Sequence, residues 1–84
     1  MPIIARFYGM VVKMYYFSNE HNPPHIHVIY GECVGVINIL DGKMIQGDLP
    51  SRALKIIEEW TILHSNELLE MWNTQEFKVL SSNI

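Results

Sequence analysis

Cysteine occurs once in this chain of 84 residues, at position 33. An intramolecular disulfide is therefore excluded, and such sparse cysteine usage fits a reducing, cytoplasmic environment. No apolar run approaches the roughly 20 residues that a membrane-spanning helix requires. The first residues also lack the basic and apolar regions of a signal peptide. We therefore expect a cytoplasmic protein without a membrane segment.

Charge is also scarce, because Asp, Glu, Lys and Arg make up only 18% of the chain. The six basic residues are scattered along the sequence and the formal net charge is −3. A dedicated nucleic-acid binder usually carries a basic stripe, so this composition disfavours nucleic acid as a partner. Hydrophobic residues, in contrast, reach 49%. We expect the surplus apolar surface to be covered by a homodimer contact or by a small partner protein.

The length predicts a single domain over residues 1–84. Its first half carries turn signals between short β-type segments, and the residues from Pro50 to about Asn73 follow a helical period of 3.6. The predicted fold is α+β, with a small antiparallel sheet of four to six short strands and one long helix packed across one face. The predicted strands cover residues 3–7, 10–17, 25–30, 34–40 and 43–46, with a last edge strand over 76–80.

Three of the four histidines fall within the run Glu20-His21-Asn22-Pro23-Pro24-His25-Ile26-His27. Residues two apart on a strand share a face, so His25 and His27 are expected side by side, with Cβ atoms roughly 6–7 Å apart. Neutral imidazoles suit transition metals such as zinc, and three protein ligands with one open position are typical of catalytic zinc. The spacing predicts His21, His25 and His27 as metal ligands, with Glu20 in support.

His64 lies on the apolar stripe of the predicted helix. We expect it to pack against the sheet and to form a hydrogen bond with a neighbouring group. A sharper hypothesis places it near the other three histidines as a supporting residue of their site. The sequence leaves these two interpretations open.

Two other functions fit the same residues. His25 and His27 could act as general base and general acid in metal-free RNA cleavage, with Lys13 or Arg6 neutralising the phosphate. Alternatively, the histidines are structural or pH-sensitive residues of a protein–protein module. The residues alone assign no catalytic role, and the question of enzymatic activity stays open.

The stretch from Phe17 to Val28, with its Glu-His-x-Pro-Pro-His-x-His-Val string, resembles the signature of small bacterial proteins catalogued as domain of unknown function 4160. The resemblance extends over nearly the whole chain and departs after Trp72, where Asn73-Thr74-Gln75 replaces a longer turn. It implies that all four histidines occupy histidine positions of the family. It also suggests a two-gene, toxin–antitoxin-like arrangement with a neighbour-encoded protein as partner. Other segments that carry the resemblance are Met1-Pro2-Ile3-Ile4, Phe7-Tyr8-Gly9, Gly47-Asp48-Leu49-Pro50, Glu59-Trp60, Leu63-His64, Glu67-Leu68 and Phe77-Lys78-Val79-Leu80.

Overall fold

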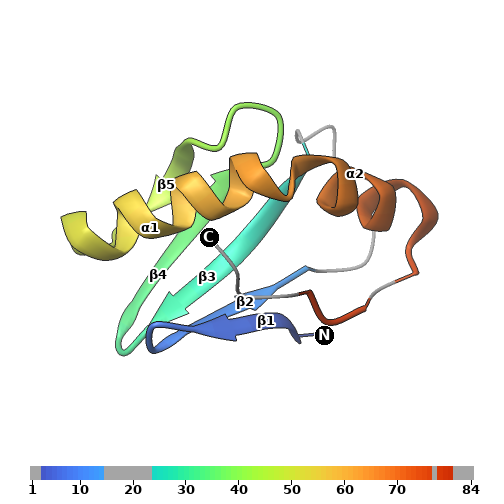
Figure 1. Ribbon diagram of the computed structural model, residues 1–84. Helices are drawn as coiled ribbons and strands as arrows, with labels where there is room; N and C mark the ends of the chain where they lie inside the picture. The colour runs from blue at the N-terminus through green and yellow to red at the C-terminus, as the bar shows by residue number, and fades with distance from the viewer. Residues whose placement is uncertain (1–2, 15–23, 77, 81–84) are drawn as a thin grey trace.

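A meander of strands followed by two helices forms the architecture of this protein (Figure 1). The computed structural model describes residues 3–14, 24–76 and 78–80. Its five-stranded sheet has the order β1-β2-β3-β4-β5, and every neighbouring pair is antiparallel. The predicted α+β fold with an antiparallel sheet is therefore confirmed. The elements are β1 (Ile3–Phe7), β2 (Met10–Lys13), β3 (His25–Tyr30), β4 (Cys33–Asn38), β5 (Met44–Gly47), α1 (Ser51–Leu63) and α2 (Ser65–Thr74).

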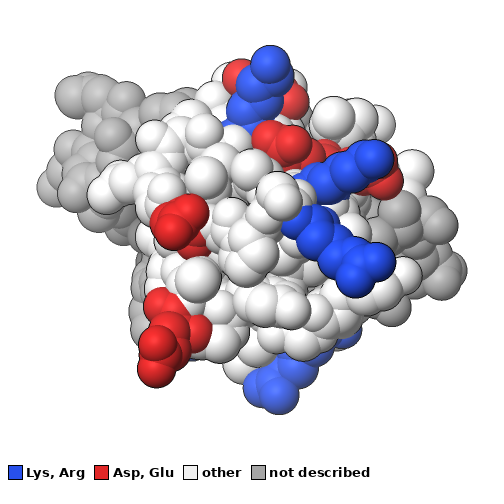
Figure 2. Space-filling model, turned by 90° about the vertical axis from the view of Figure 1, so that its left-hand side faces the viewer, with Lys and Arg blue, Asp and Glu red and all other residues white. Residues whose placement is uncertain are grey.

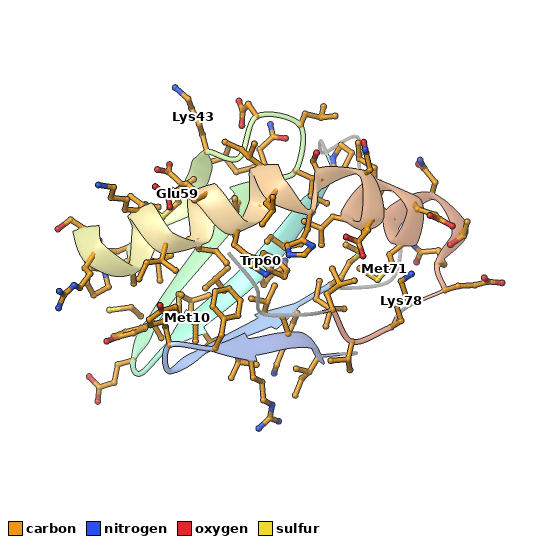
Figure 3. All side chains as sticks on the ribbon, viewed as in Figure 1. Met10, Lys43, Glu59, Trp60, Met71 and Lys78 are labelled. Atoms are coloured by element: carbon orange, nitrogen blue, oxygen red, sulfur yellow. The ribbon has the colours of Figure 1, made fainter. Side chains whose placement is uncertain are left out.

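The hydrophobic core lies between the helices and one face of the sheet. On β3, Ile26 and Val28 are fully buried, and their register partners Val12 and Ile37 are fully buried as well. Because directly paired residues of antiparallel strands share a face, these side chains form one apolar layer. In Figure 3, Trp60 and Met71 project from the helices toward the sheet. The helices contribute the buried side chains of Ala53, Ile57, Trp60, Leu68 and Met71 to this core.

The single long helix of the sequence prediction is divided at His64. The backbone of His64 has φ −105° and ψ 17°, outside the helical range. Hydrogen bonds nevertheless continue through this residue, because its N–H donates to the carbonyl of Trp60 at 3.0 Å and its carbonyl accepts from Leu68 at 2.9 Å. The result is a local bend between α1 and α2 (Figure 1). Neither helix is long and apolar enough to cross a membrane, as far as the chain is described.

The C-terminal segment returns beside β1 (Figure 1). Leu80 is buried, and its N–H donates to the carbonyl of Ile4 at 2.7 Å. The residues of this segment that the structure describes form no strand, in contrast to the edge strand expected over 76–80. One backbone hydrogen bond and one buried leucine therefore attach this segment to the edge strand β1.

Candidate functional site

Strand β3 brings His25 and His27 side by side. Their ring centroids are 5.1 Å apart, with an angle of 61° between the ring planes. Both side chains are partly buried, whereas Ile26 and Val28, which alternate with them, are fully buried in the core. The alternation of β3 thus gives one face to the core and the other to the histidine pair.

Neighbouring strands place polar groups next to these two histidines. Lys13 of β2 is the register partner of His27, and Asn38 of β4 is the register partner of His25. Directly opposed residues have Cβ atoms about 4.5–5.5 Å apart, within reach of each other's side chains. We call His25, His27, Lys13 and Asn38 the histidine cluster. It combines two imidazoles, one ammonium group and one amide on three adjacent strands.

Trp72 of α2 joins the sheet at this cluster. Its ring centroid lies 5.1 Å from that of His25, with an angle of 54° between the planes. From the sequence, Trp72 is expected only to flank the apolar stripe of the helix. Its contact with His25 depends on where α2 lies relative to the start of β3, and no local pattern encodes that position. The contact gives the cluster a fluorescent neighbour.

Burial lowers the pKa of His27 below its ordinary value of 6.5, and the nearby His25 lowers this pKa further. Both effects disfavour the charged imidazolium. At neutral pH the His27 ring is therefore neutral. This form can coordinate a metal ion or accept a proton as a general base.

The lowered pKa of His27 predicts a pH dependence of stability. As pH falls through about 6.5, the unfolded chain binds a proton at His27 before the folded chain does, so the free energy of unfolding decreases. We expect His27→Gln, which cannot take up this proton, to show a smaller decrease between pH 7 and pH 5 than the wild type. His25 beside this ring and Lys13 opposite it stay unchanged in the comparison. Urea unfolding in the presence of a chelator measures the difference, and parallel pH profiles would contradict the prediction.

His64 belongs to a separate environment between the helices and the core. Its side chain is buried, its ring centroid lies 4.9 Å from that of Trp60, and its Nδ1 is 2.9 Å from Oε1 of Glu67. This is the packed, hydrogen-bonded role expected from its place on the apolar stripe. The part of the chain that the structure describes contains no group of three His, Cys, Asp or Glu side chains arranged to hold a metal. His64 therefore does not form such a group with His25 and His27.

Two predicted site residues, Glu20 and His21, lie outside the described residues, as does the loop that carries them. The third ligand position of the predicted metal site is thus a sequence-based hypothesis. The other two predicted ligands, His25 and His27, are described, and the geometry of this pair bears on metal binding.

Comparison with known proteins gives a match to one protein-family model over most of the chain. Residues 9–73 match a family model described as "Domain of unknown function (DUF4160)". The matched range runs from just before β2 almost to the end of α2, so it includes the histidine cluster, Trp72 and His64. No curated protein and no solved structure matches the chain significantly. The functional argument therefore depends on the geometry of the cluster.

Proposed function

The chain belongs to the DUF4160 family, and we propose that it binds one transition-metal ion through His25 and His27, with His21 as the third ligand. The observation that carries the proposal is the separation of the two rings, 5.1 Å between centroids. With zinc–nitrogen bonds of about 2.0–2.1 Å, each ring centre lies about 3.2 Å from the metal. At a tetrahedral angle, two such centres are about 5 Å apart. The histidine pair thus has the spacing that a shared zinc ion requires.

The environment of the pair also suits a metal. The neutral form of His27, which its lowered pKa favours, is the form that donates a lone pair to a cation. Trp72 lies against His25 and limits the positions its ring can take. Three protein ligands leave one coordination position open, where a bound zinc ion would activate water for hydrolysis. We infer a hydrolytic metal site with this ligand set.

Elemental analysis of the untagged full-length protein tests the proposal. We expect about one zinc or other transition ion per chain, since the proposed three-histidine ligand set would hold a single ion. His25→Ala and His27→Ala should each weaken binding by at least about tenfold in a competition titration with a zinc chelator. His64→Gln is the matched control, because this histidine lies outside the pair, and it should retain the ion. Absence of metal together with no zinc uptake on titration would overturn the proposal.

Trp72 provides an optical readout of the same event. We expect Cu²⁺ added to the metal-free protein to quench tryptophan fluorescence, because the indole of Trp72 lies 5.1 Å from the His25 ring. Trp72→Phe should remove most of this quenching while the protein still takes up one ion. Trp60, whose ring lies 4.9 Å from that of His64, remains as the internal reference. Quenching that survives in His25→Ala would place the ion elsewhere.

The register pair of Lys13 and His27 favours metal-free cleavage of RNA as a second candidate. His27 would accept the 2′-hydroxyl proton, His25 would protonate the leaving oxygen, and Lys13 would neutralise the phosphate. This function predicts RNA cleavage that persists in chelator and is lost in His27→Ala. A protein–protein module with structural histidines predicts neither metal uptake nor RNA cleavage. In that case His25→Ala would leave the complex with the partner protein intact.

A further inference from the structure

A cavity lies at the opposite end of the sheet from His25, where two hairpin turns meet the start of α1. The cavity has a volume of about 570 Å³, within the range of about 300–1,000 Å³ typical of small-molecule sites. Figure 2 views this end of the molecule, where uncharged side chains cover much of the surface and acidic groups lie both at the left and among the basic groups at the top and right. The cavity is lined by Tyr8, Met10 and Tyr30 from the sheet and by Arg52, Ala53 and Ile56 from α1.

The lining residues divide into an apolar floor and a polar rim. Met10 and Ala53 are buried and form the floor, whereas Tyr8 and Tyr30 are 68% and 38% exposed. Arg52 is exposed on the first turn of α1, a turn without an acidic residue. Of the described residues that line the cavity, Arg52 alone is charged. The site therefore offers two phenol rings, an apolar base and one guanidinium group.

Tyr8 adopts a backbone conformation that is unusual for its residue type. The two-residue turn between Phe7 and Met10 has φ 52° at Tyr8 and 74° at Gly9, as a type I′ turn requires. Asn, Asp and Gly are the residues that favour the first position of this turn, and a bulky residue with positive φ is uncommon. Such strain is concentrated where a side chain is needed for function. The turn thus holds a tyrosine where an asparagine would fit the backbone better.

Both tyrosines have neighbours at the first hairpin turn. Tyr8 meets Phe7 edge to face, with centroids 6.2 Å apart and planes at 78°, and Phe7 packs on buried Trp60 at 5.2 Å. A Cβ atom built on Gly9 would lie 3.8 Å from the ring of Tyr30, so this ring lies against the hairpin turn. Both phenol rings therefore lie beside this turn.

We propose that this cavity binds a small planar aromatic molecule that carries one anionic group, either a carboxylate or a phosphate. Its ring packs against Tyr8 and Tyr30, because offset and edge-to-face contacts between aromatic rings are favourable. Its anionic group pairs with Arg52, whose planar guanidinium matches carboxylate and phosphate oxygens in two parallel hydrogen bonds. This binding is independent of the histidine cluster, which is built from other residues of the sheet.

Calorimetric titration of the full chain with naphthalene-2-carboxylate tests the proposal, with the neutral naphthalene-2-carboxamide as the comparison ligand. We expect the carboxylate to bind about tenfold more tightly than the amide, since a charge-assisted pair with Arg52 forms only with the anion. Arg52→Gln should abolish this preference. Lys55→Gln, which removes an exposed charge from the same helix outside the cavity, should retain it. No binding, or equal binding of both ligands to the wild type, would overturn the proposal.

Tyr8→Asn separates a binding role from a structural one. Asparagine suits the first position of a type I′ turn, so the midpoint of thermal unfolding should stay the same or rise. Binding of naphthalene-2-carboxylate should nevertheless weaken by about tenfold, because one of the two rings is gone. Unchanged binding in both Tyr8→Asn and Arg52→Gln would place the ligand elsewhere and refute the assignment. A lower midpoint with unchanged binding would show that Tyr8 only supports the fold.

Discussion

Replacing Gly47 with alanine is expected to lower the free energy of unfolding by about 2–3 kcal/mol. Gly47 has φ 92°, and a Cβ atom there would overlap the carbonyl oxygen of Val34 and lie 2.9 Å from Cα of Gly35. The same oxygen accepts the N–H of Asp48 at 3.0 Å. The loss combines about 1–2 kcal/mol of backbone strain with about 1 kcal/mol for a weakened hydrogen bond. Urea unfolding followed by circular dichroism measures it.

Gly31→Ala is the matched control for this prediction. Gly31 also has a positive φ, 58°, but a Cβ atom there would meet nothing within 4 Å. Its replacement should cost only the backbone strain of about 1–2 kcal/mol. The difference between the two losses in the free energy of unfolding gives the cost of the collision with the Val34 carbonyl. Equal losses in both variants would show that β4 and β5 separate at little cost to admit the extra methyl group.

The position of Gly47 shows what the sequence can predict about this fold. Gly47 pairs with Gly35 across β4 and β5, and the chain then turns over the sheet to begin α1 after Pro50. The sequence indicates that the helix begins near Pro50, because the apolar period changes to 3.6 there. Position 47 requires a glycine because β4 and β5 approach so closely that no room is left for a Cβ atom. This requirement depends on the pairing of β4 with β5. Local propensity carries no information about that distance.

The boundaries of strands and helices show the same difference between local signals, which the sequence carries, and tertiary features, which it does not. The predicted bounds of β1 and β3 agree with the structure because alternation and turn residues are local signals. The predicted helix is continuous because the apolar period continues through His64, whereas the structure bends at that one residue. A side-chain period reports which face is buried and is insensitive to the backbone angles of a single residue.

The candidate site was predictable only along one strand. Alternation alone indicates that His25 and His27 share a face, and their rings are indeed adjacent. Lys13 and Trp72 join them through strand register and helix placement, which are tertiary properties. The cavity beside Tyr8 was missed altogether. A Tyr-Gly pair is a weak turn signal, since Asn-Gly and Asp-Gly are the dipeptides that favour a type I′ turn.

Trp60→Ala is expected to lower the free energy of unfolding by about 3–5 kcal/mol. Trp60 is fully buried, and its ring packs against Phe7 at 5.2 Å and against His64 at 4.9 Å. Removing the indole leaves a cavity and also breaks the contact between β1 and the bend in the helices. A domain of this size has a total stability of about 4–13 kcal/mol, so this loss is a large share of the total and should lower the midpoint of thermal unfolding, which circular dichroism measures.

Two further variants distinguish loss of packing at Trp60 from a general weakening of the helix. Leu63→Ala removes an apolar side chain that is 59% exposed near the end of α1, and its effect should stay within about 0.5 kcal/mol. Trp60→Phe keeps an aromatic ring in the core and should lower the free energy of unfolding less than the alanine variant does.

Trp60→Phe also connects the core to the cavity. Because Phe7 contacts both Trp60 and Tyr8, Trp60→Phe should weaken ligand binding in the cavity more than metal binding by the histidine pair. Equal effects at both sites would indicate that the whole sheet has loosened, whereas a selective effect would show that the Tyr8–Phe7–Trp60 ring contacts orient the cavity.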